Sequence, residues 1–376
     1  MKDHKEFLPS PEQELLLKAA LCPAADAIRH WQAWRSQVNL ARIDAGTMRL
    51  LPLLYQNLRG QGVDDPMLNQ LKPFYRSSWF MNKLLLRAAV EPIAALKEAG
   101  IPTLVLKGAA LIAQYSTEAE ARPMGDVDVF VPTRHARKGI EIIGGCGWRP
   151  KGPLPNNSLF QAYLAVKHGH GFQNASGQII DFHWHVMDEC IDRSVDEDFL
   201  MHAVPVKIEG METMALNPAD QILHVCVHGA RWSPDPSLRW AADVMTILNR
   251  KDTFIDWDRL CRNAGELRLT LPLREALGYL KRRLDAPIPA DVLKDFRRVP
   301  VETGDRYHYW IITGSPARLG PLWRIKRQSA RYLRVVSGAG RPRRIYLFFE
   351  FLVLGLYEFS RGVLWPRLKG IKDPIP

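Results

Sequence analysis

The sequence of 376 residues has few cysteines and lacks a long apolar run. Its five cysteines lie far apart and form no C-x-x-C pair, which argues against a disulfide framework and a cysteine zinc site. The most apolar stretch, 345–357, contains Glu350 and is shorter than the roughly 20 residues that a spanning helix needs. The N-terminal segment mixes both charge signs, so we expect no secretory signal. The sequence predicts a cytoplasmic protein without a membrane span.

Acidic residues are absent from 306–349, although this stretch holds ten Lys or Arg. The whole chain has 51 Lys and Arg against 40 Asp and Glu, a formal net charge of +11, which favours anionic partners. Because the aromatic-rich segment 345–357 follows the basic residues, region 318–365 has three candidate roles. We expect packing on the core first, peripheral attachment to an anionic inner membrane surface second, and nucleic-acid binding third.

The spacing of apolar residues changes along the chain. A three- and four-residue spacing predicts helices before residue 100 and again after 218, whereas short strand-like runs occur between 103 and 186. Two of these runs, 163–173 and 178–186, flank an Asn-Ala-Ser-Gly turn and are expected to pair. The pattern predicts an α+β fold with a small mixed or antiparallel sheet flanked by helices. We divide the chain into an N-terminal helical region (1–99), a catalytic core (100–205), a helical substrate-side region (206–300) and a basic, aromatic-rich helical extension (301–376).

Two aspartates stand at the start of one predicted strand, in the run Met-Gly-Asp-Val-Asp-Val-Phe-Val. Asp126 and Asp128 are two residues apart, so their side chains point to the same face of the strand. Two crowded carboxylates repel unless a cation lies between them, and their oxygens suit Mg²⁺. Such pairs are also common at strand ends and turns, so the motif alone only suggests a metal site.

A third acid strengthens this interpretation. Asp181 follows two apolar residues on a predicted neighbouring strand, in the run Asp-Phe-His-Trp-His. Three converging carboxylates can hold two Mg²⁺ or Mn²⁺ ions for an in-line nucleotidyl displacement, and Asp181 is also placed to accept a proton from an acceptor hydroxyl. A capping or salt-bridged aspartate is the structural alternative.

Cations upstream of these acids suit phosphate binding. Lys107 and Gly108 stand at a strand-to-helix junction, where a glycine allows close backbone approach and a helix N-terminus favours an anion. Arg122, four residues before Asp126, is a candidate to neutralise the triphosphate or the leaving pyrophosphate. Either cation is alternatively an exposed loop residue.

Two His-x-His pairs, at His168 and His170 and at His183 and His185, lie on the two candidate paired strands. Together with Asp181 they are candidate zinc ligands. The plainer interpretation places only His183 beside the carboxylates and gives the other histidines surface or core roles.

The helices after residue 218 contribute weaker candidates. His224 and His228 are four residues apart on one helix, and Arg239 and Asp243 are four apart on the next. They are candidates to line the cleft opposite the sheet, where they would contact base, ribose or acceptor. The alternative is a set of inter-helix hydrogen bonds and an Arg239–Asp243 ion pair.

Five ordered blocks make the sequence similar to a nucleotidyltransferase family of the DNA polymerase beta superfamily. The blocks are LVLKGAAL (104–111), RPMGDVDVFV (122–131), IIDFHWH (179–185), DQILHVCVHGARW (220–232) and LRWAADVMTIL (238–248). The resemblance covers roughly residues 25–300 and implies a small sheet flanked by helices and Mg²⁺-dependent nucleotide transfer. By that match Asp126 and Asp128 take the metal-ligand roles and Asp181 the role of third carboxylate.

The sequence departs from this superfamily at one motif. Classical members have Gly-Ser or Gly-Gly where this chain has Lys107-Gly108-Ala109, so phosphate binding would pass to Lys107 and backbone amides.

The sequence leaves three candidate functions. The first is transfer of a nucleoside monophosphate from a nucleoside triphosphate, such as ATP, to an unidentified acceptor hydroxyl. The second is a non-catalytic nucleotide-binding or scaffold protein of the same fold at a membrane surface. The third is a glycosyltransferase that uses the Asp-x-Asp pair.

Overall fold

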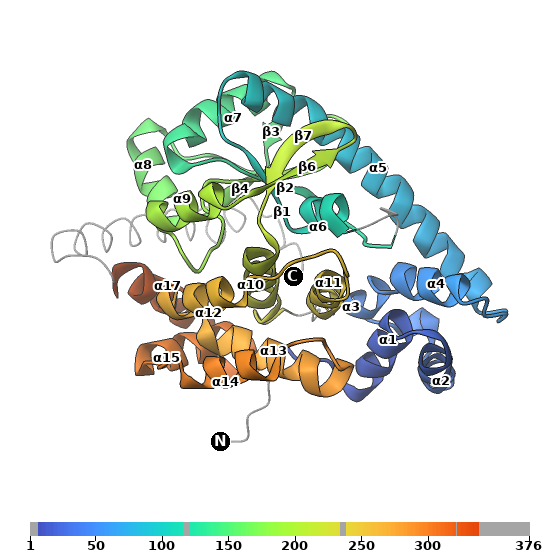
Figure 1. Ribbon diagram of the computed structural model, residues 1–376. Coiled ribbons are helices and arrows are strands. Elements are labelled where there is room, and N and C mark those ends of the chain that lie inside the picture. The colour runs from blue at the N-terminus through green and yellow to red at the C-terminus, as the bar shows by residue number, and fades with distance from the viewer. Residues whose placement is uncertain (1–6, 116–120, 234–237, 321, 338–376) are drawn as a thin grey trace.

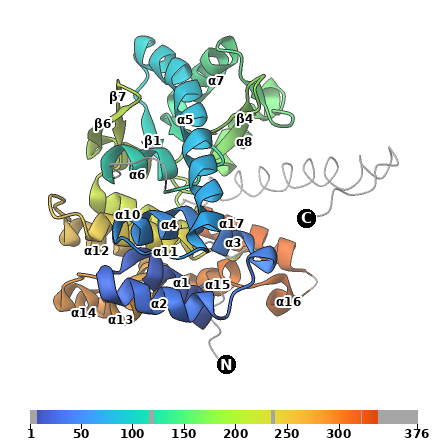
Figure 2. The ribbon, with the colours of Figure 1, turned by 90° about the vertical axis from the view of Figure 1, so that its right-hand side faces the viewer.

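The computed structural model describes residues 7–115, 121–233, 238–320 and 322–337. A sheet with its flanking helices forms the upper part of the molecule in Figures 1 and 2, and a layer of helices forms the lower part. The long helix α5 (Leu68–Glu98) runs from one part to the other. The architecture is therefore α+β, which confirms the fold class expected from the sequence.

The described elements have the following bounds. The helices before the sheet are α1 (Pro11–Leu21), α2 (Ala24–Arg35), α3 (Ala45–Met48) and α4 (Leu51–Gly60). The strands are β1 (Leu104–Leu106), β2 (Val127–Phe130), β3 (Arg149–Pro150), β4 (Gly169–Gln173), β5 (Ile179–His183), β6 (Val204–Ile208) and β7 (Met211–Ala215). The helices between strands are α6 (Lys107–Tyr115), α7 (Ala136–Gly145), α8 (Asn157–Val166) and α9 (Arg193–Met201). The later helices are α10 (Pro218–Gly229), α11 (Arg239–Leu248), α12 (Trp257–Glu266), α13 (Thr270–Leu284), α14 (Ala290–Arg298), α15 (Thr303–Ile312), α16 (Pro316–Leu319) and α17 (Trp323–Ser337).

The seven strands form one mixed sheet in the order β3-β4-β5-β2-β1-β7-β6. The central strand β2 runs antiparallel to β1 and parallel to β5. Strands β4 and β5 pair as the expected antiparallel hairpin. The edge strands β6 and β7 form a second hairpin, and β7 runs parallel to β1.

The two faces of the sheet have different surroundings because neighbouring side chains of a strand point to opposite sides. Val105 and Val129 face a buried hydrophobic cluster formed with α5 and α7. Leu106 and Phe130 face a larger cluster formed with α10 to α13 and with the N-terminal helices. Val127, Val129, Ile180 and Phe182 belong to the first cluster, so the residues of β2 and β5 that alternate with them point toward α10 and α11.

Two parts of the expected secondary structure are wrong or incomplete. The expected strand 163–173 begins only at Gly169, because residues up to Val166 belong to α8, whose N-cap Asn156 accepts a hydrogen bond from the backbone N–H of Leu159. The hairpin of β6 and β7 was not expected. Its turn places Glu209 and Gly210 at positive φ, where glycine is favoured.

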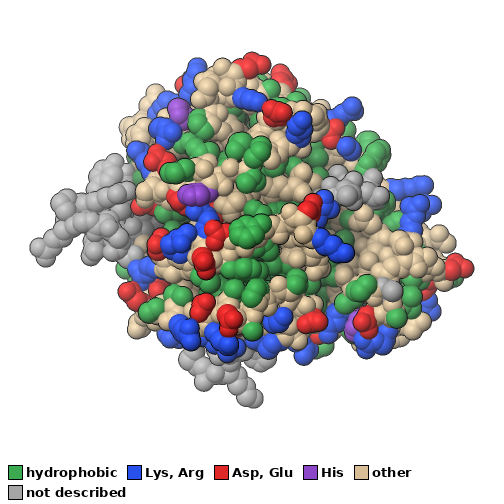
Figure 3. All heavy atoms as spheres, in the orientation of Figure 1, with side chains coloured by type: hydrophobic (Ala, Val, Ile, Leu, Met, Phe, Trp, Pro, Cys, Tyr) green, Lys and Arg blue, Asp and Glu red, His purple; other side chains and the backbone are tan. Residues whose placement is uncertain are grey.

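Within the described ranges, no helix combines the length and the hydropathy that crossing a membrane requires. The expected apolar segment 345–357 lies outside those ranges. On the face drawn in Figure 3, Lys and Arg side chains are interspersed with Asp and Glu.

Candidate functional site

The strand register brings the two main candidate carboxylates together. Strands β2 and β5 are parallel neighbours, and Asp128 lies directly opposite Asp181. Asp126 precedes β2 by one residue and lines the same cleft as Asp128. The three acids thus gather at the face of the sheet that points toward α10 and α11.

Asp128 is buried and lies at the centre of this group. Its Oδ1 is 2.5 Å from Nζ of Lys107 and 3.1 Å from Nε2 of His183. Burial alone would raise the pKa of the Asp128 carboxyl, but the charges and hydrogen bonds of Lys107 and His183 outweigh it and lower that pKa. Asp128 is therefore an ionised carboxylate held by two cations.

His183 joins Asp128 to Asp181. Its Nε2 is also 3.1 Å from Oδ2 of Asp181, and its side chain is only 1% exposed. Burial would lower the pKa of His183, but hydrogen bonds to both carboxylates raise it to about 9. The pKa of Asp181 is lowered because the hydrogen bond and charge of His183 outweigh its burial. The imidazolium consequently offsets part of the repulsion between the two acids.

Asp126 differs from the other two acids because no cation of the described residues is in contact with it. Its residue is exposed as a whole, but burial of the carboxyl in the cleft, together with the negative charges of Asp128 and Asp181, raises the pKa of that carboxyl. A carboxylate of this kind is open to a ligand cation.

Lys107 begins α6 immediately after β1 and adopts a left-handed backbone conformation, with φ of 45°. A non-glycine residue in this region costs of the order of 1 kcal/mol, and such strain persists where the surroundings fix it. The ion pair with Asp128 fixes this side chain. The strained junction thereby points the lysine at the carboxylates.

A cleft of about 320 Å³ lies between this face of the sheet and helices α10 and α11. Most of the residues expected at the site line it, namely Lys107, Gly108, Arg122, Asp126, Asp128, His224, His228, Arg239 and Asp243. Asp181 and His183 adjoin the cleft through their contacts with Asp128. The structure thus brings together residues that are separated by more than a hundred positions in the chain.

The cleft wall contains a bidentate ion pair. Nε and Nη2 of Arg122 donate to the two carboxylate oxygens of Asp243 at 2.8 and 2.9 Å. Asp243 therefore pairs with Arg122, whereas the sequence had suggested Arg239 as its partner. Gly108 allows this arrangement, because a Cβ at that position would lie 2.4 Å from Nη1 of Arg122.

Arg239 lies four residues before Asp243 on α11 and has a different role. Its Nη1 donates to the backbone carbonyl of Pro123 at 2.8 Å, and its buried Nε has no hydrogen-bond partner among the described residues. Burial and the neighbouring charge of Arg122 lower the pKa of Arg239 to about 10, so it stays cationic at neutral pH. Its side chain thus offers the cleft a positive charge with an unused donor.

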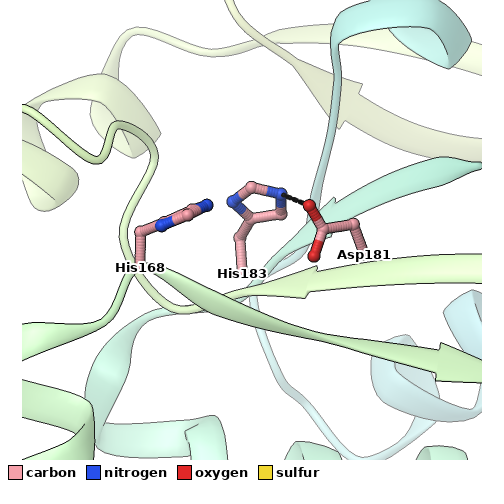
Figure 4. A group of neighbouring side chains, drawn as sticks. All are labelled: His168, Asp181 and His183. Atoms are coloured by element: carbon pink, nitrogen blue, oxygen red, sulfur yellow. Dashed lines mark ion pairs between the residues drawn. The ribbon is translucent and has the colours of Figure 1, made fainter. Parts of the chain in front are cut away.

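The four histidines of the two His-x-His pairs divide into two groups. His168 and His183 lie together with Asp181, and their ligand atoms are within 4.8 Å of one another (Figure 4). His170 instead bonds the hydroxyl of Tyr163.

His185, the other member of the second pair, contacts Asp196 at 2.5 Å and is buried. The alternative of a zinc site built from both His-x-His pairs therefore does not fit this geometry, and His183 lies beside the carboxylates as the plainer interpretation expected. A smaller set of one carboxylate and two imidazoles remains, next to the three acids.

Sequence reasoning missed three cationic or aromatic residues of the cleft. Arg231 and Trp232 line it at the end of α10, and Arg49 approaches it from the chain before α4. The first two belong to one of the five blocks noted above but were given no role. No local pattern in the sequence singles out Arg49.

The chain matches a known protein family and is similar to two solved structures. Residues 34–285 match a family described as uncharacterised nucleotidyltransferase. A solved structure of the antibiotic-resistance factor ANT(2'')-Ia is 13% identical with a TM-score of 0.34, covering 54% of this chain and 98% of its own. An antigenic nucleotidyltransferase-like protein from Paracoccidioides brasiliensis is 12% identical with a TM-score of 0.34, covering 60% of this chain and 97% of its own. A comparison with curated proteins finds no match. Since the matched residues are well over half of the chain, it belongs to the uncharacterised nucleotidyltransferase family.

Proposed function

We propose that this protein transfers a nucleoside monophosphate from a nucleoside triphosphate to an acceptor hydroxyl in a Mg²⁺- or Mn²⁺-dependent reaction. One observation carries the proposal: Asp128 and Asp181 are opposite one another on parallel strands, and Asp126 lies beside them in a cleft lined by cations. The sequence resemblance gives the same three residues the same roles.

The donor atoms fit a hard divalent cation. Three carboxylates from two adjacent strands supply only oxygen ligands, which Mg²⁺ and Mn²⁺ prefer. No cation in the described ranges pairs with the exposed Asp126, whereas Asp128 is held by Lys107 and His183. When bound, the metal supplies charge stabilisation of the α-phosphate and of the leaving oxygen.

The protein's own residues account for the remaining parts of the reaction. Arg239 and Lys107 face the cleft and bind the triphosphate, while the Arg122–Asp243 pair fixes the wall beside them. The acceptor oxygen attacks the α-phosphorus, the bond from that phosphorus to the bridging oxygen of pyrophosphate breaks, and pyrophosphate leaves. The acceptor's hydroxyl proton passes to the carboxylate of Asp181.

One observation favours a second candidate, a non-catalytic nucleotide-binding protein. Lys107 and His183 already balance the charge of Asp128, so the acidic group is stable without a divalent ion. A protein that only binds a nucleotide would use the cations of the cleft and leave this network intact.

Label transfer distinguishes the two candidates. The full-length protein is incubated with each α-³²P-labelled nucleoside triphosphate, Mg²⁺ or Mn²⁺, and a cell extract as the source of acceptor. We expect a labelled product with the wild type and its loss with Asp126→Asn and with Asp128→Asn. Asp64→Asn, at an exposed loop position, serves as the matched control and should leave labelling unchanged.

Nucleotide binding is measured in the same preparations, so that an absence of label transfer can be interpreted. Binding without label transfer in any extract, with equal binding by wild type and Asp126→Asn, would support the non-catalytic candidate. Labelling that persists in both aspartate variants would contradict the proposed roles of these residues.

A further inference from the structure

Three arginines of helix α17 contact other parts of the protein. Nη2 of Arg327 donates to the backbone carbonyl of Gly314 at 2.9 Å, and Nη2 of Arg331 donates to that of Val166 at 2.6 Å. Arg334 also donates to backbone carbonyls of other segments. This part of the acid-free stretch therefore contacts the interior, and its arginines border a cavity of about 380 Å³.

The cavity has an excess of positive charge. Within the described ranges its lining includes four arginines, Arg231, Arg327, Arg331 and Arg334, and two carboxylates, Asp188 and Glu189. His308 also lines the cavity, and burial together with the charge of Arg334 lowers its pKa to about 4, so it is neutral at pH 7. An anion that enters this partly buried space would offset the excess of guanidinium charge in the lining.

The two carboxylates fix the arginines in place. Arg231 makes a bidentate contact with Glu189 at 2.5 and 2.6 Å. Asp188 is 2.5 Å from Nη2 of Arg331 and 4.0 Å from Nη2 of Arg231. The guanidinium groups are thus positioned before any ligand arrives, which lowers the cost of binding one.

Arg327 has donor capacity left over and is held by two aromatic rings. Its guanidinium carbon is 5.1 Å from the ring centre of Trp232 and 5.0 Å from that of Trp323. Within the part of the chain that the structure describes, its buried Nε has no hydrogen-bond partner, and the same is true of Nε of Arg331. Guanidinium N–H groups in this setting suit a phosphate oxygen, and the indole rings suit the apolar part of a small molecule.

The cavity adjoins the cleft that holds the carboxylates. Arg231 and Trp232 line both spaces. A series of side chains also links them, because the ring centres of His183 and His168 are 5.0 Å apart and Nδ1 of His168 is 3.1 Å from Asp188. A molecule bound in the cavity would therefore lie on the same side of the sheet as a nucleotide in the cleft.

We propose that the cavity under α17 binds the phosphate group of a small acceptor substrate, with Arg327 and Arg331 as its main contacts. This inference rests on the proposed nucleotidyl transfer for the identity of the ligand as an acceptor. The phosphate site itself rests on the charges and contacts of the cavity. The acceptor is accordingly a phosphorylated hydroxyl compound whose anionic end is held here while its hydroxyl reaches the cleft.

Calorimetry with a phosphorylated and an unphosphorylated probe tests the site without requiring catalysis. Glycerol 3-phosphate and glycerol are each titrated into the full-length protein at low ionic strength. We expect glycerol 3-phosphate to bind and glycerol not to bind measurably. Arg327→Gln should weaken binding at least tenfold, and Arg327→Lys, which keeps the charge, should lose less.

Two control variants test whether the probe binds in this cavity, and not in the cleft or through the overall positive charge of the protein. Arg297→Gln removes an exposed arginine from α14 and should bind the probe as the wild type does. Asp126→Asn should also bind the probe normally while losing metal-dependent nucleotide binding. Thermal melting of each variant checks that the fold is retained.

The outcomes are distinct. Equal weakening in Arg327→Gln and Arg297→Gln, or no preference for glycerol 3-phosphate over glycerol, would overturn the cavity assignment. Probe binding that depends on Arg327 in a protein without label transfer would keep the phosphate site and reject the nucleotidyltransferase proposal.

Discussion

The two faces of the sheet are built from alternate residues of the same strands, yet they have opposite properties. Val127, Val129 and Phe182 are buried against hydrocarbon from α5 and α7. Asp128 and Asp181 lie between these residues in the chain and point instead into a network of charges. Neighbouring side chains of a strand face opposite ways. The three apolar residues therefore belong to a hydrophobic core, while the two aspartates between and beside them face a charged cleft. At the centre of β2 and β5, stability should therefore depend mainly on the hydrocarbon-facing residues and activity mainly on the charged residues that alternate with them.

The largest effect on stability is expected from Phe182→Ala. Phe182 is fully buried, and a Cβ added at Gly139 of α7 would lie only 2.6 Å from its ring, so the fit is close. Truncation of a buried phenylalanine costs about 3–5 kcal/mol of unfolding free energy. Urea denaturation measures the loss; a decrease below about 1 kcal/mol would show that the packing of Phe182 contributes little to stability.

Asp181→Asn, one residue before Phe182, should have a large effect on activity and a small effect on stability. Removal of the proton acceptor is expected to slow label transfer by about 10²- to 10⁴-fold. The unfolding free energy should fall by only about 1 kcal/mol, since His183 keeps its contact with Asp128. Transfer rates and urea curves of both variants belong in one experiment. Similar losses of stability in the two would contradict the division between faces.

Gly108→Ala should have an intermediate effect on the cleft. The added Cβ would meet Nη1 of Arg122 at 2.4 Å and Sδ of Met124 at 2.7 Å, and Asp243 holds that guanidinium in place. Displacement of the pair should raise the KM for the nucleotide roughly tenfold, equivalent to about 1.4 kcal/mol. Gly144→Ala on α7 is the control, because its Cβ would meet nothing within 4 Å. Equal nucleotide KM values in the two variants would argue against this role of Gly108.

The smallest expected effect is a pH dependence of stability that arises at His308, which lines the cavity under α17. The folded protein lowers the pKa of His308 to about 4, whereas an unfolded histidine has a pKa near 6.5. Between these values the unfolded chain binds the extra proton, so the stabilisation is complete above about pH 6.5 and is lost as pH falls toward 4.

The contribution of His308 cannot exceed about 1.4 kcal/mol per pH unit in this window. Urea midpoints of wild type and His308→Gln from pH 4 to 7 isolate it, with a weaker dependence expected in the variant. Parallel curves would show that His308 does not titrate as described.

The sequence predicted the parts of the site that depend on local spacing. Alternation along β2 and β5 placed Asp126, Asp128, Asp181 and His183 on one side, and the helical period predicted α10 and α11. These features follow from two regular backbone geometries and do not require knowledge of distant contacts.

The remaining features depend on contacts between distant residues. Asp243 pairs with Arg122 across 121 positions, and only the packing of α11 against the sheet decides this partner. The inward position of Arg327, Arg331 and Arg334 was equally hidden, since a basic helix with no acids gives the same pattern whether it faces solvent or a cavity. A missed signal did exist for α8, where Asn156 is a good N-cap.

Nucleotide-dependent Mn²⁺ binding, measured by electron paramagnetic resonance, tests the central claim that the three carboxylates act together on a divalent ion. The wild type and Asp64→Asn should bind Mn²⁺ tightly in the presence of a non-hydrolysable nucleoside triphosphate. Asp126→Asn, at an exposed position that leaves the buried network of Asp128 intact, should bind at least tenfold more weakly. Equal Mn²⁺ affinity in all three proteins would contradict the account.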